Sequence, residues 1–189
     1  MKTKTLALVM ALLTFVLPIL ATQKFPLNTT FNGPTFSATF PAPDDTSAGI
    51  VKTPMTGTTE TDHSSFSGLI YSSSTAGGKA WFGASSVEYV SVRGTGADNL
   101  DAVVDASLGG MKAVVVPGTR ESTVLAGLFA REAEGVTDQF DTFVRASVIE
   151  NHLFLATVVF DKSVHPTQAD ADEFFNSIHA VANPLYNRT

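Results

Sequence analysis

The run Glu150–Phe160, ENHLFLATVVF, is the most hydrophobic stretch of the chain after its first twenty residues. It is 11 residues long, whereas a helix that spans a bilayer needs about 20 apolar residues. It follows an alternating segment, Asp141–Ile149, and begins at a polar Glu150-Asn151 pair that is typical of a tight turn. A short apolar run between turns is typical of a strand with both faces buried. The run therefore predicts a central strand in a sheet that is covered on both sides.

Residues 1–22 have the pattern of a secretory signal peptide. Lys2 and Lys4 precede an apolar segment, Thr5–Leu20, and Ala21 is a small residue at a cleavage position. Ile19 is bulky where cleavage favours a small residue, so an uncleaved N-terminal anchor stays open as an alternative. We therefore expect a secreted or periplasmic protein. The chain has no cysteine, so its folded part must be stabilised by a hydrophobic core without disulfides.

The charge of the chain restricts its partners. Without Lys2 and Lys4, the 12 basic residues become 10 against 18 acidic ones, which is a formal charge of −8. An acidic surface repels phosphate backbones and anionic headgroups, so no nucleic acid partner is expected. No apolar run after residue 22 reaches the ~18 residues of a spanning helix, so no membrane span is expected after cleavage. The remaining length fits one domain.

The first half of the exported chain is predicted to be mainly strand. Residues 23–34 carry two prolines and an Asn-Gly pair and predict an irregular lead-in. Residues 35–41 place Phe36, Ala38 and Phe40 on one face and predict a half-buried strand. Residues 44–61 are polar, with Ile50-Val51 as the seed of at most a short strand. Further strands are expected where aromatic and β-branched residues concentrate, at Phe66–Ser72 and Trp81–Val92, and in a hairpin at Thr119–Gly135.

Two segments change to helical spacing. Asp98–Val116 repeats apolar residues every three or four positions, and Thr167–Val181 begins at a good N-cap residue followed by acidic residues. An Asn183-Pro184 pair ends the second helix. This order of elements predicts an α+β fold, in which a mainly antiparallel sheet carries helices on its faces. We expect one such domain at residues 35–183, followed by a tail at residues 184–189.

Several short motifs resemble those of a known family. They are FSATFP at Phe36–Pro41, LAGLFARE at Leu125–Glu132, ENHLF at Glu150–Phe154 and DADEFFNSI at Asp170–Ile178. Residues 35–181 are similar to the PsbP-like domains, whose α-β-α sandwich is shared by a photosystem II extrinsic protein and a Ran-binding nuclear-import factor. The chain departs from the family pattern by lacking a glycine before Asn151. The resemblance implies an α-β-α sandwich and a role in assembling or stabilising a protein partner.

The sequence offers no complete catalytic constellation, so no catalytic residue, metal or cofactor is expected. The four histidines lack the spacing of a metal pair. The acidic residues Asp161, Asp170 and Asp172 lie near His165 and favour a capped helix start, with a cation site as the alternative. Glu132 and Glu134 lie on one side of a predicted strand. They resemble the paired carboxylates of a glycosidase, although a solvated charged face is the default interpretation.

Four residues are the candidates for contact with a partner or ligand: Trp81, Arg131, Asp161 and His165. Trp81 is expected in the core or, if exposed, in a protein, peptide or glycan contact. The leading hypothesis is an exported, non-catalytic domain that binds or stabilises a protein partner in the cell envelope or outside the cell. The alternatives are a carrier of a small hydrophobic ligand in a cleft between sheet and helix, and a hydrolase.

Overall fold

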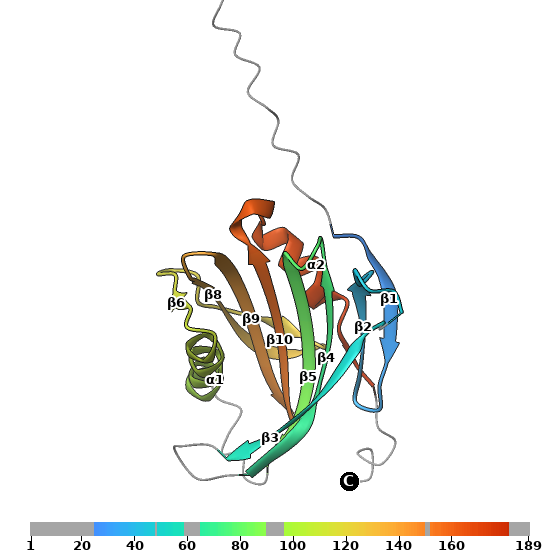
Figure 1. Ribbon diagram of the computed structural model, residues 1–189. Coiled ribbons are helices and arrows are strands. Elements are labelled where there is room, and N and C mark those ends of the chain that lie inside the picture. Colours follow the sequence, from blue (N-terminus) through green and yellow to red (C-terminus); the bar gives the residue numbers. More distant parts are fainter. Residues whose placement is uncertain (1–24, 48, 59–64, 90–96, 150–151, 182–189) are drawn as a thin grey trace, which may run out of the picture.

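The computed structural model describes residues 25–47, 49–58, 65–89, 97–149 and 152–181, which form two antiparallel sheets and two α-helices (Figure 1). The large sheet has eight strands. Its order is β3 (Val51–Thr58), β4 (Ser65–Thr75), β5 (Ala80–Tyr89), β10 (His152–Asp161), β9 (Phe140–Ile149), β8 (Leu128–Val136) and β6 (Val114–Val115), with β7 (Glu121–Leu125) also paired to β8. Within these ranges, no helix is long and apolar enough to cross a membrane.

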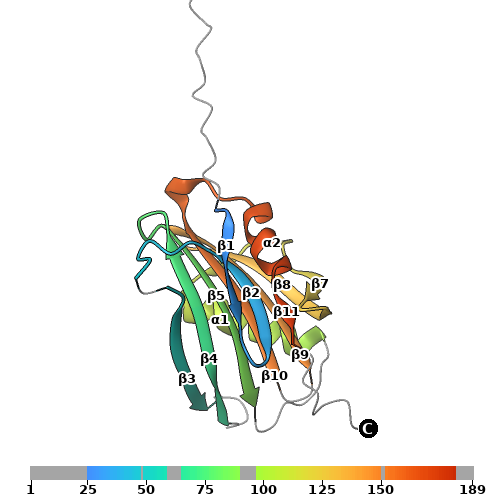
Figure 2. The same ribbon diagram turned by 90° about the vertical axis from the view of Figure 1, so that its right-hand side faces the viewer.

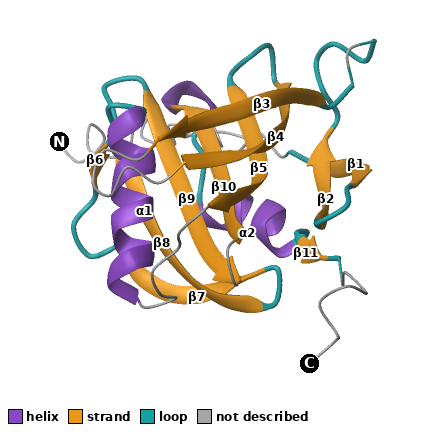
Figure 3. Cartoon of the chain, turned by 90° about the horizontal axis from the view of Figure 1, so that it is seen from below, coloured by secondary structure: helices purple, strands orange, loops and turns teal. Residues whose placement is uncertain are grey.

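The two faces of the large sheet are covered by different elements, as Figure 3 shows. Helix α1 (Ala97–Gly110) lies on one face, where Leu100, Val104 and Leu108 pack on the sheet. The other face carries helix α2 (Gln168–Asn176) and the small sheet, which is also seen in front of the large sheet in Figure 2. The small sheet has the order β1 (Leu27–Asn32), β2 (Phe36–Pro41) and β11 (His179–Ala180).

The core between the large sheet and α2 consists mainly of phenylalanine side chains. Phe40 of β2 and Phe82 of β5 both contact Phe174 of α2, with ring centroids 5.1 and 5.4 Å apart. Phe82 also meets Phe160 of β10 edge to face at 5.6 Å. Each ring removes a large apolar area from water, and the contacts between the rings stabilise the core further. They fill the space in which a ligand carrier would need a cleft, so this region gives the carrier alternative no support.

The prediction of a central strand is confirmed for the described part of Glu150–Phe160. β10 lies between β5 and β9 from His152 to Phe160. Val158 and Phe160 are fully buried in the phenylalanine core, while Leu153 is buried against the α1 side. The turn at residues 150–151 lies outside the described residues, as do the signal segment 1–22 and the tail 184–189.

The α+β class is confirmed, and so is the alternation of β2, whose Phe36, Ala38 and Phe40 are all buried. The hairpin of β7 and β8 is also confirmed, with its turn at Ala126-Gly127. Both predicted helices exist, although α1 ends at Gly110 and β6 follows it.

The irregular lead-in predicted for residues 23–34 is wrong, because Leu27–Asn32 forms strand β1. Its main chain pairs with β2 along the strand, and this pairing outweighs the low strand propensity of its asparagines. The folded domain therefore begins before residue 35. The polar segment 44–61 likewise contains an eight-residue strand, β3, which tolerates Pro54 because it lies at the edge of the sheet.

The second helix is shorter than predicted. It ends at Asn176, where the Ser177 hydroxyl lies 2.7 Å from the Phe174 carbonyl oxygen and 3.1 Å from the Thr39 carbonyl oxygen and shares its one proton between them. The Thr39 amide in turn donates to the Ser177 hydroxyl at 3.1 Å. These bonds fix the chain against β2, and β11 then adds to that strand.

Candidate functional site

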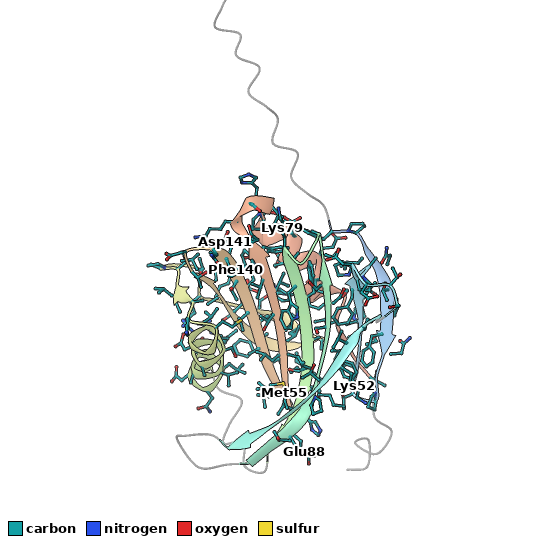
Figure 4. The ribbon with its side chains drawn as sticks, viewed as in Figure 1. Lys52, Met55, Lys79, Glu88, Phe140 and Asp141 are labelled. Atoms are coloured by element: carbon teal, nitrogen blue, oxygen red, sulfur yellow. The ribbon has the colours of Figure 1, made fainter. Side chains whose placement is uncertain are left out.

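Three of the four predicted contact residues lie at one end of the large sheet. Asp161 ends β10, and its amide donates to the carbonyl of Lys79, just before the strand that carries Trp81. His165 follows in the loop after β10. In Figure 4 the labelled side chains of Lys79 and Phe140 mark this end of the sheet. Arg131 lies elsewhere, on β8 beside α1, so the structure does not bring the four residues into one site.

Asp161 and His165 have local structural roles. The Asp161 carboxylate accepts a bond from the Ser163 amide at 2.8 Å and caps the 3-10 helix η2 (Lys162–Val164). Hydrogen bonds from Ser163 hold the pKa of Asp161 below its usual value. His165 is exposed, and its amide closes the same helix by donating to the Lys162 carbonyl.

The other carboxylates near His165 are also engaged by separate partners. Asp170 accepts bonds from the backbone amide and hydroxyl of Thr167, so it caps the start of α2 as expected. Asp172 binds Arg145. In the described part of the chain, no group of three or more acidic or histidine side chains is placed to hold a metal ion.

Trp81 is half-buried on the face of the sheet that carries α1. Its indole lies over Gly83, two residues along the same strand, so closely that a Cβ atom on Gly83 would be 2.2 Å from the ring. Gly83 is thus required for the position of the indole. The neighbouring Phe82 faces the opposite side and is fully buried.

Gly83→Ala is therefore expected to displace the indole, with only a small loss of stability because the clash is with the outer end of a half-buried side chain that can move. Trp81 is the only tryptophan, so a red shift of its fluorescence emission measures the displacement directly. Gly109→Ala is the matched control, because a Cβ atom there meets nothing within 4 Å. An unchanged spectrum in Gly83→Ala would contradict the assigned ring position.

Arg131 belongs to an ion-pair network between α1 and the β7–β8 hairpin. Its guanidinium donates to both carboxylate oxygens of Asp101, at 2.8 and 3.2 Å, and to the Ser122 hydroxyl at 2.8 Å. Arg120 contacts Asp101 and Asp105. The hydrogen bond from Arg131 is the main reason that the pKa of Asp101 is lowered. Since these side chains are partly exposed, the network orients the hairpin more than it stabilises the domain.

An exposed apolar pair lies beside this network. Val124 of β7 and Phe129 of β8 are directly opposite each other, and their side chains are 56 % and 50 % exposed. Phe129 shares the parity of Arg131, so the pair lies on the face that carries α1. We call Val124 and Phe129, with their polar neighbours Ser122 and Arg131, the β7–β8 patch.

The opposite face of the same hairpin carries a buried ionic cluster. Arg145 of β9 donates to Glu132 of β8 at 2.6 Å, to Asp172 of α2 at 2.8 Å and to the Val124 carbonyl of β7 at 3.2 Å. Its guanidinium also lies 4.7 Å from the ring centre of Phe175. One side chain thus joins three strands and a helix. Arg145 and Glu132 are 4 % and 6 % exposed, so the solvated charged face expected here is wrong.

Burial changes the protonation of this cluster. Loss of hydration raises the pKa of Glu132 from its usual 4.5 to about 7; Arg145 opposes this shift, and the Glu121 carboxyl adds to it. Burial also raises the pKa of Glu134, helped by the charge of Asp141. Glu132 and Glu134 do lie on one side of β8, as predicted.

The two glutamates border a hollow between β8, β9 and α2. It has about 170 Å³ of empty volume including its open mouth, and the enclosed part holds about one water molecule. Such a space does not admit a sugar or an acyl substrate, so it gives the hydrolase alternative no support. The lining residues are Thr119, Glu132, Ala133, Glu134, Phe143, Val144, Gln168 and Phe175.

Sequence reasoning missed Arg145, Asp172 and Phe129 as members of these sites. A signal for Arg145 was present, because it shares the parity of the core residue Phe143 in β9. An arginine at a core-facing position is rarely buried unless it is paired. Val148 lies on the opposite face of β9 from Phe143. The apolar residues of this strand do not alternate regularly because both of its faces are buried.

The fold and these two features define the class of the protein: an α+β domain with a buried ionic cluster on one face of a hairpin and an exposed apolar patch on the other. No protein-family model matches the chain, and a search of curated proteins finds no match to it.

Proposed function

We propose that this chain is an exported, non-catalytic domain that binds a protein partner through the β7–β8 patch. The observation that carries the proposal is the exposure of Phe129, a phenylalanine with half of its surface in water, directly beside the exposed Val124. Half-exposed aromatic residues next to an arginine are characteristic of the residues that contribute most to protein interfaces.

The surroundings of the pair fit such an interface. Arg131 and Ser122 lie two pairs further along the same two strands, on the same face, and form a polar rim. Arg131 is held rigidly by two bonds to Asp101, so its guanidinium loses little freedom when a partner binds. A partner that fits this surface presents an apolar side chain to Phe129 and Val124 and a polar group to the rim.

The PsbP-like resemblance and the pattern of residues 1–22 support the rest of the proposal. The first implies an α-β-α sandwich whose role is to assemble or stabilise other proteins, and the second implies that this takes place in the periplasm or outside the cell.

Photo-crosslinking in the native host tests the site of binding. A photoreactive phenylalanine analogue at position 129 is expected to give a discrete adduct with one partner protein. The same analogue at position 114 is the matched control, because Val114 is 70 % exposed but lies on β6, outside the patch. Val124→Ser is expected to reduce the adduct at position 129, whereas Val114→Ser leaves it unchanged. Equal adducts from positions 129 and 114, or none from 129, would contradict the proposal.

A further inference from the structure

The carboxyl groups of Glu121 and Glu132 lie next to each other across the β7–β8 pair. The two residues are directly opposite in the strand register, so their side chains point to the same face. The Glu121 carboxyl contributes to the raised pKa of Glu132, after burial and against the opposing charge of Arg145. Two carboxylates on directly opposite residues repel each other unless one of them keeps its proton.

The charges around this pair also favour a retained proton. Arg145 supplies one positive charge, which it divides between Glu132 and Asp172. The charged and titratable groups of the described residues around Glu132 are Glu121 from β7, Glu134 from β8, Asp141 and Arg145 from β9, Lys162 beside Asp141, and Asp172 from α2. Carboxyl groups therefore outnumber the two cations, and repulsion is weakly screened at Glu132, which is buried, while Glu121 is exposed.

We propose that the Glu121–Glu132 carboxyl pair is a proton-dependent contact that holds β7 against β8 and thereby controls the β7–β8 patch. The inference rests on the proposed function, because it assigns a regulation to the same surface. When Glu132 is protonated, its O–H donates to the Glu121 carboxylate. When the proton leaves, the hydrogen bond is lost and two negative charges face each other across the strand pair. Since Val124 belongs to β7, loosening of this strand divides the patch.

The direction of the effect follows from the pKa of Glu132. It is about 7 in the folded chain, above the usual 4.5, chiefly because Glu132 is buried and in smaller part because of the Glu121 carboxyl. The folded state therefore binds a proton that is released when opening of β7 exposes Glu132 to water. The contact is therefore fully present below about pH 4.5 and is lost as the pH rises through about 7. A change of pH in the neutral range thus alters how firmly β7 is held.

Amide hydrogen exchange of the purified chain tests the contact. Protection factors of the β7 amides, each referred to the intrinsic rate at the same pH, are compared at pH 5.5 and pH 7.5. We expect them to fall on the order of tenfold at the higher pH, while the amides shared by β4 and β5 keep their protection. Glu132→Gln stays neutral at both values and still donates to Glu121, so its β7 protection is expected to stay high at pH 7.5.

A purely structural role for Glu132 would lower β7 protection in Glu132→Gln at both pH values, and this result would overturn the inference. A wild-type protection that is the same at both values would also overturn it. Glu121→Gln is the second variant, because it removes one of the two charges without changing a buried group. The fall in its β7 protection between pH 5.5 and pH 7.5 is expected to be smaller than in the wild type. Exchange is measured without a partner, so failure of the crosslink at position 129 contradicts only the proposed function.

Discussion

Val158→Asp is expected to unfold the domain. Val158 is fully buried at the centre of β10, the strand that joins the two halves of the large sheet. An ionised aspartate at this position has no partner within the phenylalanine core, and its desolvation costs several kcal/mol in addition to the lost packing. Domains of this size are stable by about 5–15 kcal/mol, so this cost is a large part of the total. The variant should lack the native circular dichroism spectrum at 25 °C and should show no cooperative transition on heating.

Val114→Asp is the matched control for this experiment. It introduces the same change at a valine that is 70 % exposed, and surface substitutions usually alter stability by no more than about 0.5 kcal/mol. The central position of β10 would be contradicted by a Val158→Asp protein that melts at the temperature of the wild type.

Arg145→Ala is expected to lower the free energy of unfolding by about 3–5 kcal/mol, the usual effect of leaving a buried charge without its partner. The variant loses the bonds to Glu132, Asp172 and the Val124 carbonyl together. The loss should be larger at pH 8 than at pH 5.5, because Glu132 is protonated at the lower pH and then needs no positive partner. Urea unfolding at the two pH values measures both effects.

Two further variants separate the buried charge from the packing. Arg120→Ala removes an arginine from the partly exposed network and is expected to cost at most about 1 kcal/mol. Adding Glu132→Gln to Arg145→Ala should recover part of the stability at pH 8, since no buried carboxylate then stays unpaired. No recovery would mean that the unpaired Glu132 carboxylate is not the cause of the loss, which then comes from the contacts of Arg145 with Asp172, the Val124 carbonyl and Phe175.

The parts of the fold that the sequence predicts best are those whose burial pattern is strong and local. The run at β10 is apolar on both faces, and β2 alternates phenylalanine and alanine with polar residues. The start of α2 is marked by Thr167 and Asp170, which form the expected capping contacts. In these segments each residue's local preference agrees with the tertiary structure.

Most of the parts that the sequence did not predict depend on partners that are distant in the chain. β1 is the exception: it pairs with the next strand, β2, and the prolines and asparagines in and around it favoured an irregular segment. The ionic cluster joins Arg145 to residues 13 and 27 positions away, and no short motif marks that spacing. The exposure of Phe129 could not be predicted either. Strand alternation gives the face of the sheet on which Phe129 lies, but it does not show that α1 leaves this position uncovered.

The small sheet joins the beginning of the folded chain to its end. Thr39 and Ser177 are bonded across 138 positions, and β11 adds to β2. Contacts between such distant residues form late, because the intervening chain must first be ordered. The phenylalanine core therefore lacks Phe174 and its neighbours until almost the whole chain is available. A chain exported as we propose would thus cross the membrane before it can fold, which keeps it competent for translocation.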